Sequence, residues 1–409
     1  MTMQKPSNSI FTIAVIVAAL GYFVDIYDLL LFNIVRIPSL TSLGLNTEQV
    51  NSSGEKIIMI QMFGLLIGGV IWGIMGDKKG RLSVLFGSII LYSTANIFNG
   101  FVHTVNAYAT TRFIAGIGLA GELGAGITLV SELISKEKRG IATSFVAGIG
   151  LTGAVVAYFI SRTFDWRICY FIGGGLGFCL LILRVSVFES GMYRQVKESK
   201  VSRGNFGMFF NNGTRFKKYI LSILIGLPTW YVIGILIAFS NKFGKQFHIQ
   251  EDIIPGKATM YAYIAISVAD VLVGFVSQWL KSRKKALYIF YFLTTVGIGL
   301  YFSPINNNAT VMYLICAFLG FSTGFWALFV TMAAEQFGTN LRAMAATTAP
   351  NMVRGSLAFL ALPIFNWLQH YFSYAQSGLV TGCVVMAITV TAAIFTKETF
   401  GKELNYVES

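Results

Sequence analysis

Two aspartates stand close together inside the first long apolar stretch of the chain. Asp25 and Asp28 are three residues apart, so in a helix both carboxylates lie on one face. Ionisable groups at membrane depth cost about 2.5–3.5 kcal/mol each on insertion scales, and they therefore indicate function or pairing. Two neighbouring carboxylates in a low dielectric cannot both be ionised comfortably, so we expect one to exchange a proton near neutral pH. A structural pair neutralised by arginine is the alternative.

A third acid, Glu122, lies in another apolar stretch, with Arg112 ten residues before it. Ten residues of helix span about 15 Å at 1.5 Å per residue, so Arg112 can pair with Asp28 more easily than with Glu122. We predict that the proton-coupling group consists of Asp25, Asp28, Glu122 and Arg112. For Arg112, an ion pair that only holds helices together remains the alternative.

The second half of the chain carries one acid and one base at similar depth. Asp270 lies near the middle of one apolar stretch, and Arg354 near the middle of another, with Asn351 on its face. A guanidinium holds a carboxylate or phosphate through two parallel hydrogen bonds, so Arg354 is our candidate for binding an anionic group. Asp270 is expected to neutralise Arg354 in the empty site or to hold a cationic group. A permanent Asp270–Arg354 structural pair is the alternative.

Aromatic side chains at similar depth are candidates for lining a substrate cavity, although packing is the commoner role of any one of them. The candidates are Tyr27, Trp230, Tyr231 and Trp326. We find no nucleophile–base set, phosphate-binding loop or metal-ligand cluster. The four cysteines lie within apolar blocks without a CxxC pair. The sequence therefore predicts neither an enzyme nor a cofactor.

Long apolar stretches carry all these side chains. The chain has 409 residues, of which 55% are hydrophobic and 12% charged, whereas soluble domains carry about 25% charged residues. Many stretches approach the ~20 residues that cross a ~30 Å hydrocarbon core. We predict an all-α membrane protein with twelve transmembrane helices, at about 10–37, 56–77, 82–103, 107–134, 139–163, 166–188, 217–243, 257–281, 284–304, 309–337, 341–367 and 372–397.

The longest polar segment, 189–216, divides these helices into six and six. We predict an N-terminal bundle at 1–188, a cytoplasmic linker at 189–216 and a C-terminal bundle at 217–409. Lys and Arg gather in alternate loops, which places both termini in the cytoplasm by the positive-inside rule. The net charge of +13 is therefore a topology signal and does not indicate nucleic-acid binding. We expect a monomer in the inner membrane.

Two motifs repeat between the halves. Glu132 and Arg139 at the end of the fourth helix match Glu335 and Arg342 at the end of the tenth. The loop from 73 to 81 is echoed weakly by 274 to 285. Matching halves favour alternating access, in which the halves rock around a site at the membrane midplane.

The loop Gly73-Ile-Met-Gly-Asp77-Lys-Lys-Gly80-Arg81 resembles the signature G-x-x-x-D-(R/K)-x-G-(R/K) of the major facilitator superfamily at every defined position. The resemblance implies two six-helix bundles whose helices 1, 4, 8 and 11 face a central cavity. It also implies a gating cluster that latches the halves on the cytoplasmic side, formed by Gly73, Asp77, Gly80, Arg81, Glu132, Arg139, Glu335 and Arg342.

The fourth predicted helix resembles one particular branch of this superfamily. Its pattern of Arg112, Gly116 and Gly121-Glu122-Leu-Gly124 is similar to that of metabolite:proton symporters. Asp25-Ile-Tyr27-Asp28 in helix 1 is similar to a motif of that branch and of aromatic-acid symporters. The leading hypothesis is proton-coupled symport of a small carboxylate or zwitterionic metabolite. An exporter or facilitator for a metal ion, siderophore or drug stays open, as does a non-transporting nutrient sensor on a transporter fold.

Overall fold

The computed structural model describes residues 12–134, 138–188, 206–338 and 341–402, and every regular element within these ranges is a helix. The first half contains α1 (Ile13–Ser42), α2 (Thr47–Lys79), α3 (Arg81–Asn99), α4 (Val105–Leu119), α5 (Glu122–Leu133), α6 (Arg139–Leu151), α7 (Gly153–Thr163) and α8 (Trp166–Phe188).

The second half begins with a 3-10 turn, η2 (Phe206–Phe209), and includes two π-helical segments, η3 (Val232–Ile237) and η4 (Leu357–Ala361). Its α-helices are α9 (Gly213–Leu224), α10 (Leu227–Tyr231), α11 (Ser240–Gln246), α12 (Pro255–Trp279), α13 (Arg283–Tyr301), α14 (Ala309–Ser322), α15 (Trp326–Glu335), α16 (Arg342–Ser356), α17 (Leu362–Leu368) and α18 (Tyr374–Phe395).

These elements form twelve membrane-crossing segments, because several crossings are built from consecutive shorter helices. Among the described residues, ten segments are long and apolar enough to cross a membrane by length and composition. The other two are α13, which starts with three basic residues, and the run α16–η4–α17, which contains Arg342 and Arg354. The predicted all-α fold of twelve transmembrane helices in two six-helix bundles is confirmed.

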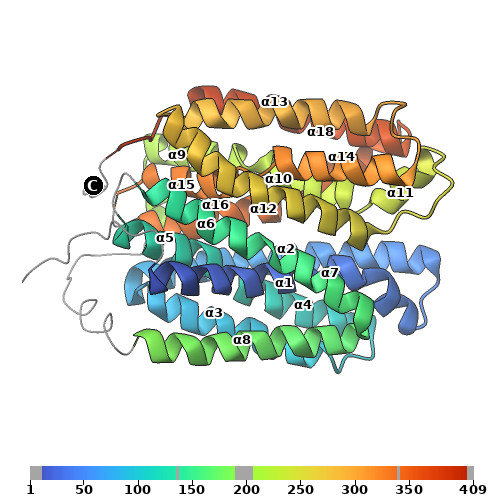
Figure 1. Cartoon of the computed structure of the whole chain (residues 1–409), viewed down its shortest axis with the longest axis horizontal. Helices are drawn as coiled ribbons and strands as arrows, with labels where there is room; N and C mark the ends of the chain where they lie inside the picture. The colour runs from blue at the N-terminus through green and yellow to red at the C-terminus, as the bar shows by residue number, and fades with distance from the viewer. Residues whose placement is uncertain (1–11, 135–137, 189–205, 339–340, 403–409) are drawn as a thin grey trace, which may run out of the picture.

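The two bundles lie side by side with their helices along the long axis of the molecule (Figure 1). Helices of the first half, blue to green, occupy one side of the view, and those of the second half, yellow to red, occupy the other. Between the bundles, α2 packs against α16 and α6 packs against α12. Residues 189–205 of the predicted linker lie outside the described residues, so the domain limits remain a prediction.

Polar caps set the helix starts more exactly than apolar content does. Helix α2 begins at Thr47, well before the predicted start at 56, because Asn46 and Gln49 form a capping box. The expected turn at Gly80 is present: this residue has a φ of 92° between α2 and α3. An L side chain is strained at such a φ, which explains glycine at this position.

Two crossings that the sequence predicted as continuous are broken at matching places. The fourth crossing is interrupted at Ala120–Gly121, between α4 and α5, and the tenth at Thr323–Phe325, between α14 and α15. A broken helix leaves backbone N–H groups that must find acceptors inside the membrane. The second half-helices, α5 and α15, therefore start beside buried acids, as the site shows.

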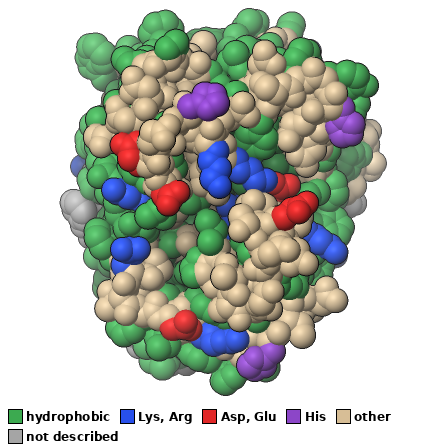
Figure 2. Space-filling model, turned by 90° about the vertical axis from the view of Figure 1, so that its right-hand side faces the viewer, with side chains coloured by type: hydrophobic (Ala, Val, Ile, Leu, Met, Phe, Trp, Pro, Cys, Tyr) green, Lys and Arg blue, Asp and Glu red, His purple; other side chains and the backbone are tan. Residues whose placement is uncertain are grey.

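The end of the molecule where α1 joins α2 and α7 joins α8 is shown in Figure 2. Hydrophobic side chains cover much of the rim of this face, whereas charged and other polar groups gather nearer its centre. The apolar rim is suited to contact with lipid, and the polar centre to contact with water.

Candidate transport site

Arg354 of α16 lies at the interface between the bundles and is 1% exposed. Its Nη2 atom is 3.9 Å from Oδ2 of Asp25 on α1. Its Nη1 atom donates a long hydrogen bond of 3.4 Å to Oδ1 of Asn351, one turn earlier. Its Nε atom has no acceptor among the described residues. A guanidinium offers five N–H donors, so Arg354 is poorly satisfied for a buried cation.

Two tryptophan rings flank this arginine. The guanidinium carbon of Arg354 is 6.0 Å from the ring centroid of Trp230 on α10 and 5.7 Å from that of Trp326 on α15. The faces of aromatic rings attract cations. Trp326 Nε1 is buried and has no acceptor in the described part of the chain. The site thus offers a cation, two flat apolar faces and a spare N–H donor.

Asn351 connects the arginine to the other bundle. Its Nδ2 atom donates to the carbonyl oxygen of Ala120 at 2.7 Å and to that of Thr347, also at 2.7 Å. Ala120 lies at the break between α4 and α5, where a carbonyl is available to an outside donor. Rocking of the bundles would therefore act directly on the residue that orients Arg354.

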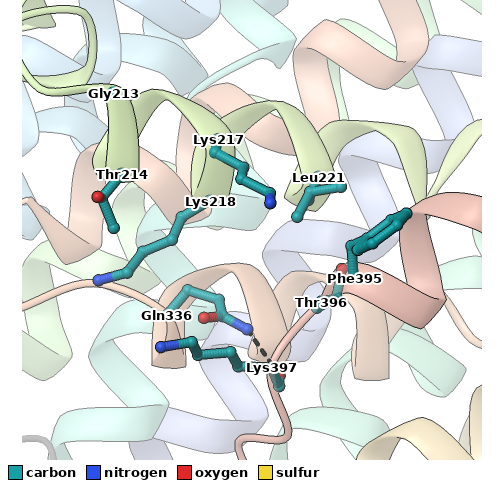
Figure 3. Close-up of a pocket in the computed structure, with 9 residues that line it drawn as sticks. All are labelled: Gly213, Thr214, Lys217, Lys218, Leu221, Gln336, Phe395, Thr396 and Lys397. Carbon is teal, nitrogen blue, oxygen red and sulfur yellow. Dashed lines mark hydrogen bonds between the residues drawn. The ribbon is translucent and has the colours of Figure 1, made fainter.

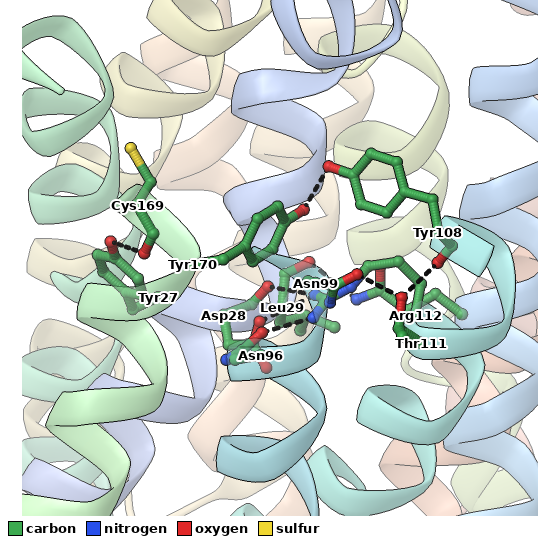
Figure 4. Close-up of polar contacts among 11 residues, drawn as sticks. Tyr27, Asp28, Leu29, Asn96, Asn99, Tyr108, Thr111, Arg112, Cys169 and Tyr170 are labelled. Atoms are coloured by element: carbon green, nitrogen blue, oxygen red, sulfur yellow. Dashed lines mark hydrogen bonds and ion pairs between the residues drawn. The ribbon is translucent and has the colours of Figure 1, made fainter. Parts of the chain in front are cut away.

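Asp28 and Arg112 form a separate buried pair within the N-terminal bundle (Figure 4). Arg112 Nη1 donates to Asp28 Oδ1 at 2.9 Å, and both side chains are fully buried. Arg112 also donates to Asn96 Oδ1, and its guanidinium lies 4.7 Å from the ring centroid of Tyr170. The Arg112–Asp28 contact is the one that the helix spacing favoured. Arg112 thus contacts Asp28, Asn96 and Tyr170.

Glu122 is held by an arginine that the sequence analysis missed. Arg184 of α8 forms a two-pronged ion pair with Glu122, the first residue of α5, and also donates to the Leu85 carbonyl oxygen at 3.1 Å. Gly21 of α1 makes room for the pair, because a Cβ there would overlap both charged groups. An arginine within the apolar run 180–185 was a usable signal for this partner.

Asp270 does not form the expected pair with Arg354. Its Oδ1 atom accepts a hydrogen bond of 2.9 Å from the backbone N–H of Ala327, at the start of α15. No ion pair joins it to Arg354 in the described residues, and the cation pairs with Asp25 instead. The break in the tenth crossing explains the difference. It leaves backbone N–H groups at the start of α15 without partners in the helix, and these groups attract a carboxylate. The sequence analysis predicted one continuous helix here, at 309–337.

Two predicted cavity aromatics belong to bundle packing in this structure. The Tyr27 hydroxyl donates to the Cys169 carbonyl oxygen at 2.8 Å, within the N-terminal bundle (Figure 4). The Tyr231 hydroxyl donates to the Gly378 carbonyl oxygen on α18 at 2.7 Å. The geometry thus brings Trp230, Trp326 and Asn351 to Arg354, while the hydroxyls of Tyr27 and Tyr231 contact other helices.

The predicted gating residues lie at the end of the molecule where α1 begins and α18 ends. Gly73 of α2 packs against Met344 and Thr348 of α16, across the bundle interface. Arg81 donates to the Gly76 carbonyl oxygen at 3.4 Å. Asp77, Glu132 and Arg139 stand in helices, but their side chains lie outside the described residues. Arg342 begins α16 and is buried.

Glu335 has an arginine partner in a position that matches the repeat. Its Oε1 atom is 3.3 Å from Nη2 of Arg283, the first residue of α13. Arg81 is likewise the first residue of α3. Arg283 and Glu335 of the second half therefore occupy positions that match those of Arg81 and Glu132 in the first half.

Comparison with known proteins identifies the architecture. The family model of the Major Facilitator Superfamily matches residues 11–362. The chain belongs to this superfamily. It is a transporter rather than an enzyme, and its relatives carry names of metabolite transporters.

The putative niacin/nicotinamide transporter NiaP of Bacillus subtilis is 24% identical over 399 residues, which cover 95% of this chain and 96% of that protein. The niacin transporter NiaP of Acinetobacter baylyi is 23% identical over 388 residues, covering 86% and 87%. The structure of the proton:xylose symporter XylE bound to 6-bromo-6-deoxy-D-glucose matches with a TM-score of 0.74 at 18% identity, covering 96% of this chain and 97% of that one. This last likeness concerns the fold.

Contacts between the bundles shield the site of this major facilitator at both ends. At one end, the Thr143 and Thr331 hydroxyls are 3.2 Å apart. At the other, Lys242 Nζ is 2.7 Å from Glu55 Oε1, and Arg36 donates to the Ala238 carbonyl oxygen at 3.2 Å. The central side chains Asp25, Trp230, Trp326 and Arg354 are all buried. In this structure these side chains are therefore shielded from solvent.

A surface pocket of about 450 Å³ lies elsewhere, between the start of α9 and the end of α18 (Figure 3). Lys217, Lys218 and Lys397 line it, together with the apolar side chains of Leu221 and Phe395. None of its lining residues belongs to the group around Arg354. We therefore take the buried group between the bundles as the transport site.

Proposed function

We propose that this major facilitator couples inward proton movement to the uptake of a small carboxylate or zwitterionic metabolite. A flat aromatic monocarboxylate is the first candidate. One observation carries the proposal: Arg354 is a buried guanidinium at the bundle interface whose Nε has no acceptor in the described residues and whose carboxylate partner, Asp25, is 3.9 Å away. Arg112 and Arg184, at similar burial, each have an acidic partner at hydrogen-bond distance.

The chemistry around Arg354 favours an aromatic acid. A substrate carboxylate would accept two parallel hydrogen bonds from the guanidinium. Its ring would then lie near the Trp230 and Trp326 faces, with the spare Trp326 N–H available to a second acceptor. Niacin, which the names of both relatives contain, is a pyridine carboxylate and meets these requirements. An aliphatic acid would satisfy the arginine but leave the rings unused.

The position of the site suits alternating access in the inner membrane, with both termini in the cytoplasm. A substrate held by Arg354 of one bundle and facing Asp25 of the other would contact both moving parts. Opening on either side then requires only that the contacts at that end separate. Lys242–Glu55 at one end and Thr143–Thr331 at the other are such contacts. We include Arg283–Glu335, inside the C-terminal bundle, as a support of the second gate.

The proposal is tested with purified protein in liposomes. An inward proton gradient should drive radiolabelled nicotinate above its equilibrium level, and a protonophore should abolish the accumulation. Arg354→Ala should remove uptake, whereas Arg162→Ala, an exposed arginine at the end of α7, should not. Uptake that only equilibrates, with counterflow exchange intact, would instead support a facilitator. Gradient-driven uptake that survives Arg354→Ala would contradict the assigned site.

A further inference from the structure

Asp25 differs from the other buried acids of the molecule's centre. In the described residues, neither of its carboxylate oxygens has a hydrogen-bond donor, although the side chain is fully buried. Asp28 accepts from Arg112, Glu122 from Arg184, and Asp270 from a backbone N–H. A buried carboxylate without donors is expensive in its ionised form. The charge of Asp25 therefore depends on the nearby Arg354.

The groups that act electrostatically on Asp25 come from several helices. The acids Asp28 and Glu122 each have an arginine of their own. Arg354 is the cation that faces Asp25, at 3.9 Å. Other titratable or charged groups on the helices around Asp25 include Tyr22 of α1, Tyr92 of α3, Arg112 of α4, Arg184 of α8, and Tyr263 and Asp270 of α12.

We propose that Asp25 and the substrate carboxylate compete for Arg354, and that Asp25 takes up the transported proton as the substrate arrives. This inference rests on the proposed function and names its coupling residue. In the empty site, ionised Asp25 faces Arg354 at 3.9 Å, a separation beyond hydrogen-bond distance. The substrate carboxylate accepts the hydrogen bonds of the guanidinium, and Asp25 loses its countercharge. One proton from the solvent then binds a carboxylate oxygen of Asp25, and no other bond forms or breaks.

Charge balance supports this order of events. Before binding, one carboxylate faces one guanidinium. Afterwards, the substrate carboxylate faces the guanidinium and Asp25 is neutral. The buried site therefore has the same net charge in both states, which avoids an uncompensated charge at membrane depth. Release of the proton on the inner side restores the Asp25 charge, and Asp25 then displaces the substrate from Arg354.

The Asp28–Arg112 and Glu122–Arg184 pairs are less suited to this exchange. Their closest atoms are already at hydrogen-bond distance, and Arg112 has further contacts with Asn96 and Tyr170. Each pair also lies within the N-terminal bundle, so a substrate bound to Arg354 need not touch it. Asp25 faces Arg354 of the other bundle at 3.9 Å, so a substrate bound to Arg354 changes the surroundings of Asp25.

The first test measures how many protons the protein takes up for each nicotinate that it binds. Nicotinate is added to purified protein in weakly buffered detergent solution containing a pH indicator. The wild type should take up about one proton per bound nicotinate, and its affinity should fall about tenfold per pH unit as pH rises. Asp25→Asn should bind nicotinate with no proton uptake and a flat pH profile. The matched control Asp252→Asn, an exposed carboxylate between α11 and α12, should keep both properties.

The outcomes separate this inference from the proposed function. If Asp25→Asn still takes up a proton and keeps its pH slope, the inference is wrong while proton-coupled symport stands. If the wild type binds nicotinate without proton uptake and shows no gradient-driven transport, the symport proposal fails as well. Loss of gradient-driven accumulation in Asp25→Asn, with counterflow exchange retained, supports both.

A second test needs no substrate. Arg354→Gln removes the countercharge, so Asp25 should be protonated in the empty protein at neutral pH. The infrared C=O stretch of a protonated carboxylic acid should appear in Arg354→Gln relative to the wild type. It should disappear in the double variant Arg354→Gln/Asp25→Asn. Absence of the band in the single variant, or its persistence in the double variant, overturns the inference.

Discussion

Asp25 of α1 and Arg354 of α16 face each other at 3.9 Å across the bundle interface, and both are poorly satisfied by other partners. Two incompletely satisfied opposite charges, one on each moving half, can be rearranged by a ligand at little cost. A ligand cannot so easily rearrange the Asp28–Arg112 and Glu122–Arg184 pairs inside the N-terminal bundle, because their atoms are already at hydrogen-bond distance. This contrast distinguishes a transport site from structural ion pairs at the same depth.

Arg354→Lys tests whether geometry or charge binds the substrate. Lysine keeps the positive charge but cannot give two parallel hydrogen bonds to a carboxylate. Loss of one charge-assisted bond costs about 1.5–3 kcal/mol, so nicotinate affinity should fall about 10- to 100-fold. Isothermal titration calorimetry measures this change. Unchanged affinity would mean that the substrate carboxylate does not bind this guanidinium.

Trp326→Leu tests whether the site prefers rings. Stacking and cation–π contacts contribute about 1 kcal/mol, so nicotinate should bind about fivefold more weakly. Propionate, which has no ring, should be affected much less. Trp279→Leu is the matched control, because this tryptophan is 82% exposed at the end of α12. Equal weakening of both acids by Trp326→Leu would indicate general damage to the site.

The sequence predicted the twelve crossings better than it predicted which buried charged side chains pair with each other. Apolar length and basic loops depend on composition, so they can be counted along the chain. The Arg112–Asp28 contact followed from helix spacing. The Arg354–Asp25 and Arg184–Glu122 pairs depend on how distant helices pack, and the break before α15 diverts Asp270 to a backbone N–H. Spacing along one helix cannot indicate such contacts.

Glu122→Gln should lower the stability of the fold more than it lowers proton-coupled uptake. The change leaves the buried Arg184 without its countercharge, which typically destabilises by about 3–5 kcal/mol. The purified variant should therefore unfold at a lower temperature. Gly21→Ala should lower this temperature by less, because its Cβ displaces only the ends of the Glu122 and Arg184 side chains and both charges remain. Glu55→Gln breaks a partly exposed pair and should cost less than about 1 kcal/mol.

Uptake per folded transporter decides the role of Glu122. If Glu122→Gln folds normally but loses gradient-driven uptake, the glutamate carries a proton, as the sequence analysis predicted. Partial recovery of thermal stability in Glu122→Gln/Arg184→Gln would support the structural role, because the double variant contains no lone buried charge.

Glu398, beyond the end of α18, should make stability depend on pH. Burial alone raises its pKa, but hydrogen bonds from the Ser282 hydroxyl and from backbone N–H groups, including that of Arg283, outweigh this and lower it. A lowered folded-state pKa means that ionised Glu398 stabilises the fold above its ordinary pKa of about 4.3. This stabilisation is lost as the pH falls through the folded-state value.

Thermal unfolding of Glu398→Gln checks this linkage. The variant should melt below the wild type at neutral pH, and the difference should shrink as the solution is acidified past the ordinary glutamate range. Glu251→Gln, an exposed acid near the start of α12, should show no such trend. A difference that is constant with pH would point to lost packing rather than lost charge.

Entry of one proton together with one carboxylate predicts electroneutral transport. A monoanion that enters with a single proton moves no net charge, so uptake should respond to the pH difference across the membrane and not to its potential. Liposomes with a potassium gradient and valinomycin impose a potential without a pH difference, and nicotinate should not accumulate in them. A pH difference alone, with the potential clamped at zero, should drive accumulation. Potential-driven uptake would require a second proton, and Asp28, whose Oδ2 has no donor in the described residues, would then be the next residue to test.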